Sequence, residues 1–163
     1  MTVSREQFKQ AMGSFPTGVT VTTAYSETGE VVGMTASAFS SVSLDPLLVL
    51  MCPAKAAECY QPLTEASYFS IHLLAGDQSA LAWQFAKSDM DKTAGLEISQ
   101  GPGGSPKIQG CLAYLECRHY ALYDGGDHGI LVGEVTHIEF SDQERDPLVY
   151  CKSALGPLPA IGT

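Results

Sequence analysis

Three short segments of the sequence hold residue types that could bind a ligand. The first is MTASAFSSVS, from Met34 to Ser43, in which five hydroxyl residues are separated only by small or apolar ones. A solvated loop would normally carry charges, whereas small hydroxyl residues let a ligand approach the backbone and donate hydrogen bonds to a phosphate or a polar ring edge. The alternative is a serine-rich strand and turn that binds nothing.

The second segment is YDGGDHGI, in which Gly125 and Gly126 favour a turn and His128 shortly precedes a predicted strand that begins at Ile130. A histidine at the entrance of a strand can face a ligand. It can equally be a turn histidine that forms hydrogen bonds with its own loop. Both interpretations stay open at this point.

The third segment is KSDMDKTAG, where Lys87 and Lys92 are two of only nine cationic residues and follow a predicted helix that ends near Ala86. In an acidic chain, one of these lysines near the hydroxyl-rich segment would neutralise a phosphate. The alternative is that both lysines are solvated. Trp83 and Phe85, in the preceding helix, are predicted to belong to the core rather than to stack on a ligand.

The composition limits the ligands and partners that the protein can bind. The 163 residues include nine Lys and Arg against eighteen Asp and Glu, which gives a formal net charge of -9. This negative charge repels nucleic-acid phosphates and anionic lipid headgroups, so we expect no nucleic-acid partner and no membrane partner. With 45% hydrophobic and 17% charged residues, the chain is predicted to form one domain over residues 1–163.

Other common catalytic and cofactor motifs are missing from the sequence. There is no glycine-rich loop of the GxGxxG or Walker type, so neither common nucleotide-binding fold is supported. No serine or cysteine lies in a nucleophile-elbow motif, which leaves covalent hydrolysis without a candidate residue. His72, His119 and His137 lie in predicted strands at spacings that match no ligand pattern, so no metal site is expected.

The five cysteines are odd in number, and no pair has the two-residue gap typical of thiolate metal sites. We therefore predict free thiols in a reducing cytoplasm. The N-terminus shows no basic region followed by an apolar stretch, and the longest apolar run, from Leu47 to Cys52, is far too short to span a bilayer. The protein is expected to be intracellular.

Local patterns predict two helices and one long loop. A short helix is expected from about Arg5 to Ser14, because Ser4 and Gln7 have the spacing of a capping box. A second helix is expected to begin after an Asp77 cap, with apolar residues four apart on one face. The glycine-rich and proline-rich segment from Ser99 to Pro106 is predicted to be a loop.

Alternating and apolar runs predict the strands. A β-hairpin is expected from the β-branched run between Val19 and Tyr25, followed by the turn SETG and the strand EVVGMT. Later strands are LLVLM, YFSIHLL, CLAYLEC and ILVGEVTHIEF. Helices interrupt these strands irregularly, unlike the regular alternation of a doubly wound sheet. The predicted fold class is therefore mainly β, an antiparallel barrel of about six strands with peripheral helices.

Taken together, these segments resemble the flavin reductase-like family, the short-chain NAD(P)H:flavin oxidoreductases that serve two-component flavin monooxygenases. The resemblance covers nearly the whole chain and rests on five segments in order: FPTGVTVTT, GMTASAFSSVSLDPLLVLMC, FSIHLLAGDQSALAWQFA, GCLAYLEC and GDHGILVGEV. It implies an FMN-binding split β-barrel, Greek-key-like, that forms a homodimer with flavin in a groove near the subunit interface.

The resemblance also implies which residues hold the flavin. Four residues of the hydroxyl-rich segment would contact the edge of the isoalloxazine ring and the ribityl chain: Thr35, Ala36, Ser37 and Ala38. The other contacts, along the ribityl chain, the phosphate and the walls of the groove, would come from Ser41, Val42, Ser43, Cys52, Pro53, Phe85, Ala86, Lys92, Thr17 and Gly18. His128 would lie near the flavin face where nicotinamide stacks, and would orient the nicotinamide rather than act as a strong base.

The implied reaction is hydride transfer from NADH or NADPH to FMN or FAD, which depends mainly on the positioning of two stacked rings. Reduced flavin would then diffuse to a flavin-dependent monooxygenase. Two alternatives stay open: an electron carrier that retains its flavin and has no nicotinamide activity, and a reductase of another acceptor such as a corrinoid or quinone. The choice between FMN and FAD, and between NADH and NADPH, also stays open.

Three positions depart from the family pattern. Thr93 follows Lys92 where the family usually has an aromatic residue, which predicts a looser wall beside the flavin phosphate. His72 stands where the family often has asparagine. The tail after Tyr150 reads CKSALGPLP instead of a basic residue, glycine and tyrosine, which bears on nucleotide preference.

Overall fold

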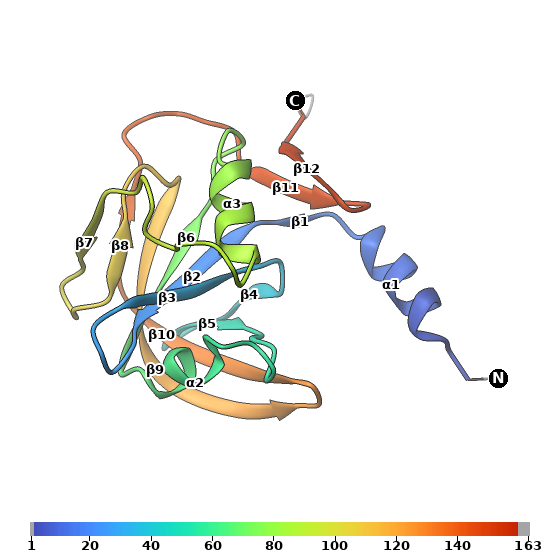
Figure 1. Ribbon diagram of the computed structural model, residues 1–163, viewed down its shortest axis with the longest axis horizontal. Helices are drawn as coiled ribbons and strands as arrows, with labels where there is room; N and C mark the ends of the chain where they lie inside the picture. Colours follow the sequence, from blue (N-terminus) through green and yellow to red (C-terminus); the bar gives the residue numbers. More distant parts are fainter. Residues whose placement is uncertain (1, 160–163) are drawn as a thin grey trace.

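The computed structural model describes residues 2–159 and is mainly β (Figure 1). The helices are α1 (Arg5–Gly13), α2 (Tyr60–Glu65) and α3 (Ser79–Ala86). The strands are β1 (Thr17–Gly18), β2 (Thr20–Tyr25), β3 (Val31–Ala36), β4 (Phe39–Leu44), β5 (Leu47–Met51), β6 (Tyr68–Leu73), β7 (Ile98–Gln100), β8 (Pro106–Ile108), β9 (Ala113–Gly125), β10 (His128–Phe140), β11 (Leu148–Cys151) and β12 (Ala154–Pro157). The prediction of about six strands was too low. Five of the strands it missed have only two to four residues, too few to show an alternating pattern, and β4 lies in the hydroxyl-rich segment FSSVSL, which has no apolar alternation.

Seven strands form one antiparallel sheet in the order β3-β2-β6-β9-β10-β5-β4. Its two edge strands, β3 and β4, are consecutive in the chain and are joined only by Ser37 and Ala38. A two-residue link can join opposite edges only if the sheet curls round until they meet at that end. The result is a barrel that is open between β3 and β4, which confirms the predicted split-barrel fold class.

Two apolar cores lie on opposite faces of the sheet. The inner core fills the barrel with side chains from β2, β3, β5, β6, β9 and β10, among them Met51, Phe69, Ile71, Leu115 and Leu131. The second core packs α3, β8 and β11 against the outside of β2, through residues such as Val21, Phe85, Ile108 and Leu148. The second core therefore anchors α3 beside the open edge β3.

The outer face of β6 and β9 is polar, yet it is buried. Ser70, His72, Tyr114 and Glu116, which we call the polar cluster, are each at most 3% exposed. The hairpin of β7 and β8 covers them, so the prediction of one loop from Ser99 to Pro106 was wrong at both ends of that segment. Only residues 101–105 lie between the two strands.

Glycines let the loop between β7 and β8 lie directly on the polar cluster. A Cβ atom on Gly101 would lie 1.8 Å from the Tyr114 hydroxyl and 2.5 Å from Glu116 Oε1. A Cβ atom on Gly103 would lie 2.5 Å from the ring of Tyr68. The loop composition that looked like an irregular connection is therefore required for close packing.

His72 joins β6 to both neighbouring layers. Its Nδ1 atom donates to the Val21 carbonyl oxygen at 3.0 Å, and its Nε2 atom accepts from the Ile108 N–H at 3.0 Å. The ring is therefore neutral and protonated on Nδ1. Burial lowers the pKa of His72 to about 4, against the opposing effect of the hydrogen bond to Val21. His72, which stands where the family often has asparagine, therefore places a titratable group in the buried polar cluster.

We expect the stability of the protein to fall as the pH drops from 7 to 5. Because the folded state holds the pKa of His72 at about 4 and the unfolded value is 6.5, the unfolded chain binds a proton more readily between these values. This linkage lowers the free energy of unfolding by about 2 kcal/mol between pH 7 and pH 5. Urea denaturation at both pH values measures it. His72→Asn is expected to flatten the pH dependence by that amount, and equal slopes for both proteins would contradict the prediction.

Helix α1 begins as predicted but stands away from the rest of the protein (Figure 1). Ser4 and Gln7 form the capping box, with Gln7 N–H donating to Ser4 Oγ at 3.1 Å and Ser4 N–H donating to Gln7 Oε1 at 2.9 Å. No residue of α1 is buried. Its apolar residues Phe8 and Met12 therefore remain 60% and 53% exposed.

Two predictions about α3 were wrong. The helix is capped by Gln78 rather than Asp77, whose Oδ1 atom instead accepts from Arg145 Nη1 at 3.4 Å. Trp83 is 51% exposed and not part of the core, whereas Phe85 is buried as predicted. The five cysteines are free thiols as predicted. Among residues 2–159, no helix is long and apolar enough to cross a membrane.

Candidate functional site

The link between β3 and β4 lies at the end of the split barrel where these two edge strands meet. Ser37 and Ala38 are exposed, and the link is tight because Phe39 N–H donates to the Ser37 carbonyl oxygen at 3.0 Å. Ala36, just before the link, is 7% exposed and its carbonyl oxygen accepts from Thr20 Oγ1 at 2.9 Å. The chain therefore presents small side chains and exposed backbone on a fixed base.

The end of β5 connects this link to His128. Cys52 N–H donates to the Ala38 carbonyl oxygen at 3.2 Å, and Gly129 N–H donates to the Pro53 carbonyl oxygen at 2.9 Å. A further β-bridge pairs Ala54 with His128. The structure thus brings together two segments that are about ninety residues apart, and we call Ser37, Ala38, Cys52, Pro53 and His128 the link site.

One acidic residue, Asp127, contacts the ring of His128. Its Nδ1 atom lies 2.6 Å from Asp127 Oδ1, and this hydrogen bond lowers the pKa of Asp127. The histidine therefore contacts its own loop, as one of the two interpretations predicted, but its side chain is still 43% exposed. Since Asp127 engages Nδ1, the Nε2 atom on the other side of the ring is left for contact with a ligand.

A groove of about 570 Å³ leads away from the link site along the open edge of β3. One wall comes from the end of α3 and the segment after it, and the other from residues that follow β5. The lining residues are Val31, Val32, Gly33, Met34, Thr35, Ala56, Ala57, Glu58, Cys59, Phe85, Ala86, Lys87, Ser88, Met90 and Lys92. Four sequence-predicted site residues, Thr35, Phe85, Ala86 and Lys92, therefore lie together.

The end of α3 fixes the one charged group that was predicted for this groove. Lys92 Nζ donates to the carbonyl oxygens of Gln84, at 2.9 Å, and of Lys87, and lies 5.9 Å from the centre of the Phe85 ring. Two carbonyl oxygens at a helix C-terminus favour a cation there. Thr35 Oγ1 donates to the Ala82 carbonyl oxygen at 2.6 Å, which ties β3 to α3.

The other eleven predicted site residues do not line this groove. Five of them make up the link site, Ala36 directly precedes it, and five lie away from both: Thr17, Gly18, Ser41, Val42 and Ser43. Thr17 and Gly18 form β1, which pairs with β11 in a separate three-stranded sheet. The Thr17 Oγ1 atom is buried and has no hydrogen-bond partner within residues 2–159. Residues 41–43 lie in the edge strand β4, where a bulge interrupts the pairing with β5. The contacts of these residues do not connect them with the groove.

The departures from the family pattern have local consequences. Thr93 is exposed, and both its N–H and its hydroxyl donate to Asp91 Oδ1 at 2.8 Å. It therefore stabilises a local turn instead of forming part of the groove wall. Met90 lines the groove from the same segment. The unusual tail forms β12, which pairs with β11.

Sequence reasoning missed the wall formed by residues 56–59 and the ion pair between Lys55 and Asp124. This pair, together with Lys55 N–H donating to the Asp127 carbonyl oxygen at 3.0 Å, holds the wall against the turn that carries His128. Lys55 and Asp124 are 69 positions apart and have no local motif, so nothing in the sequence indicated their contact.

The donors of the link site and groove fit a phosphorylated flavin. Lys92 has three N–H groups, of which two contact carbonyl oxygens, so the third can bind a phosphate. Ser37 is exposed at the link, and Thr35 retains acceptor capacity after donating to Ala82. The groove volume falls in the range of about 300–1,000 Å³ usual for cofactor sites.

Comparisons with known proteins agree with this geometry. A family model described as the flavin reductase like domain matches residues 12–159. The chain is 43% identical over 154 residues to an FMN reductase (NADH) of Agrobacterium fabrum, covering 91% of this chain and 83% of that protein. It is 34% identical over 148 residues to the reductase subunit of a flavin-dependent monooxygenase of Rhodococcus jostii, covering 91% and 75%.

Among solved structures, an NADH:FAD oxidoreductase of Streptomyces globisporus in complex with NAD and FAD fragments matches with a TM-score of 0.88. The match has 36% sequence identity and covers 98% of this chain and 97% of that chain. Since the family model spans most of the sequence and the relatives match over nearly all of it, the chain belongs to the flavin reductase-like family.

Proposed function

We propose that this chain reduces FMN or FAD with a hydride from NADH or NADPH, and that the reaction takes place at the link site. The observation that carries the proposal is that the floor of the groove and the wall formed by residues 56–59 both lead into the link site. Thr35 continues into Ala36 and the link, and Ala56 follows the β-bridge between Ala54 and His128. A ring at the link site can therefore extend its side chain directly into the groove.

In this arrangement the exposed backbone of Ser37 and Ala38 binds the polar edge of the flavin ring. Thr35 faces the ribityl chain, and Lys92 holds the phosphate with its free N–H group. Phe85 and Ala86 border the phosphate, while Cys52 and Pro53 support the ring from the end of β5. The bound flavin supplies the hydride acceptor, and the protein supplies position.

Residues 17–18 and 41–43 enter the proposal only at the rim of the site. The unpaired Thr17 hydroxyl is a buried polar group of the kind that a ligand or water normally satisfies. Ser41, Val42 and Ser43 line the open edge next to the link. Their contribution to flavin binding depends on what covers β4.

We propose that a second copy of the chain covers α1 and the edge of β4 in a homodimer. Phe8 and Met12 on α1 are 60% and 53% exposed, and Phe15, two residues after the helix, is 68% exposed. Val42 and Leu44 on β4 are 49% and 89% exposed. A group of large apolar side chains on the surface of a small protein is typical of a subunit interface. The unpaired edge of β4 also favours association.

Met12→Ser is expected to weaken the dimer about 30-fold. Each copy loses the burial of one apolar side chain, about 1 kcal/mol, and a two-fold interface counts that loss twice. Sedimentation over a concentration series should show the unmodified protein at twice the 17.3 kDa chain mass. Phe140→Ser removes a 77% exposed aromatic residue from β10 and serves as the control. A monomeric unmodified protein at micromolar concentration would refute the dimer.

We propose that reduced flavin leaves the site and diffuses to a flavin-dependent monooxygenase. The relative from Rhodococcus jostii is the reductase subunit of such an enzyme, which supports this role. We further propose a cytoplasmic location, supported by the free thiols, and one flavin reductase-like domain over residues 1–163, supported by the family match to residues 12–159.

The experiment that tests the function is anaerobic stopped-flow absorbance. The protein with one equivalent of FMN or FAD is mixed with NADH or NADPH, and bleaching of the oxidised flavin band is followed. Bleaching much faster than that of free flavin is the expected result. Bound flavin without bleaching would support the flavin-retaining carrier instead, and slow flavin reduction with fast reduction of a corrinoid or quinone would identify another acceptor.

A further inference from the structure

The groove extends further from the link site than a flavin with one phosphate requires. Its floor is five consecutive residues of β3, from Thr35 near the link to Val31 at the start of the strand. At about 3.3 Å per residue, this floor is about 13 Å long. Because β3 is an edge strand, alternate residues direct free N–H and C=O groups out of the sheet.

The positions of its charges divide the groove into two parts. Thr35 bonds to Ala82, one turn before Phe85, and a Cβ atom on Gly33 would lie 3.1 Å from the Phe85 ring. Helix α3 therefore runs along β3 toward Val31. Lys92 lies above Phe85, so its ammonium group lies near the middle of the floor rather than at the far end.

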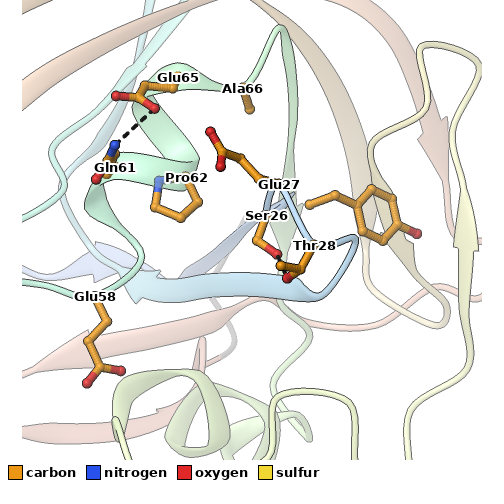
Figure 2. A pocket seen from close by; sticks show the side chains of 9 residues that line it. Ser26, Glu27, Thr28, Glu58, Gln61, Pro62, Glu65 and Ala66 are labelled. Carbon is orange, nitrogen blue, oxygen red and sulfur yellow. Dashed lines mark hydrogen bonds between the residues drawn. The ribbon is translucent and has the colours of Figure 1, made fainter.

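Glu58 marks the far end. It also lines the neighbouring pocket of about 590 Å³ beside the turn between β2 and β3, so it lies near the start of β3 (Figure 2). Figure 2 shows its carboxylate apart from the pair formed by Gln61 and Glu65. Between Lys92 and Glu58 the groove is lined mainly by small or apolar side chains such as Val31, Ala57 and Met90.

We infer that this far part of the groove binds the adenosine half of FAD, which makes FAD the preferred flavin. The inference rests on the proposed function, since it requires the flavin phosphate at Lys92. An ionised carboxylate only accepts hydrogen bonds. At the far end, Glu58 therefore favours ribose hydroxyls or the adenine amino group and repels any phosphate group placed there. Lys87 and Lys92 face the diphosphate of FAD.

Fluorescence titration of flavin with the protein, without nicotinamide, tests the inference. FAD is expected to bind about 10-fold more tightly than FMN. Glu58→Ala is expected to raise the Kd for FAD about 10-fold, the loss of a hydrogen bond to a charged acceptor, and to change the Kd for FMN less than about 2-fold. Glu65→Ala is the matched control, because it removes the same charge from a residue that lines only the neighbouring pocket.

The adenosine half of NADH has the same chemistry, and the two sources are separated by kinetics. If Glu58→Ala leaves the Kd for FAD unchanged and raises the KM for NADH, the groove serves the nicotinamide donor and the inference fails. Equal binding of FMN and FAD, or equal losses for both flavins in Glu58→Ala, also overturns it. Failure of the proposed function is distinct, because NADH and NADPH would then not bleach the flavin, whatever the Kd values of FAD and FMN.

Discussion

Glu116→Ala is expected to lower the free energy of unfolding by about 3–5 kcal/mol, because it removes a buried charge from three donors that depend on it. Gly103 N–H donates to Glu116 Oε2 at 2.7 Å, and Ser105 donates to Oε1 through its N–H at 3.2 Å and its hydroxyl at 2.7 Å. The carboxylate is 1% exposed, so water cannot replace these bonds while the β7–β8 hairpin stays in place.

Urea denaturation measures this loss, and pH separates charge from packing. Burial raises the pKa of Glu116, but the hydrogen bonds from Ser105 and Gly103 outweigh burial and lower it overall. The stability that the carboxylate provides is therefore complete above its unfolded pKa of 4.5 and is lost as the pH falls through the lower folded value. Glu116→Gln should remove this acid-dependent part.

Glu139→Ala is the control for Glu116→Ala. Its carboxylate is 43% exposed and pairs with Lys107 at the surface, so its loss is expected to cost less than about 1 kcal/mol. If Glu116→Ala costs no more than this control, the polar cluster does not hold the hairpin. The apolar contacts of Ile108 in the second core would then be the anchor.

The strands with a regular pattern could be predicted from the sequence. The β2–β3 hairpin and β5, β6 and β10 follow runs of β-branched or alternating apolar residues, and their observed bounds differ from the predictions by a few residues. The second half of β9, residues 118–125, was missed because its sequence RHYALYDG does not continue the apolar run of CLAYLEC, and these residues are mostly exposed. That half pairs with the start of β10, which places His128 inside a strand rather than before one.

The polar cluster could not be predicted, because Ser70, His72, Tyr114 and Glu116 have the alternating polar pattern of a solvated strand face. What buries them is a hairpin whose glycines and prolines indicate a loop. Polar residues on alternate positions show that one face differs from the other. They do not show whether water or another part of the chain covers it.

The candidate site divides in the same way. Thr35, Phe85, Ala86 and Lys92 were expected together because the family resemblance linked their segments, and the groove brings them together. The wall at 56–59 was not expected, because its sequence AAEC matches no binding motif. The sequence shows Asp127 next to His128. The hydrogen bond between them, which orients the His128 ring, depends on the geometry of the turn and could not be predicted.

His128→Ala is expected to lower kcat/KM for NADH about 100-fold while changing the Kd for flavin less than about 3-fold. Asp127 binds Nδ1 and the Ala54 bridge fixes the backbone, so the ring is held in a defined orientation within the link site. Hydride transfer requires two rings at close distance, and a displacement of about 1 Å can cost about 100-fold. Flavin binding depends instead on the link backbone and on Lys92, which the substitution leaves in place.

Steady-state kinetics with NADH, together with flavin titration of the same variant, test this separation of roles. His128→Gln retains a hydrogen-bonding group and is expected to recover part of the lost kcat/KM. His119→Ala removes a histidine from β9, where it pairs with Gly133 away from the link, and controls for general damage to the sheet. If His128→Ala weakens flavin binding by the same factor as kcat/KM, the histidine supports the flavin itself. Turnover would then depend on cofactor occupancy, and the assignment of His128 to the nicotinamide would be wrong.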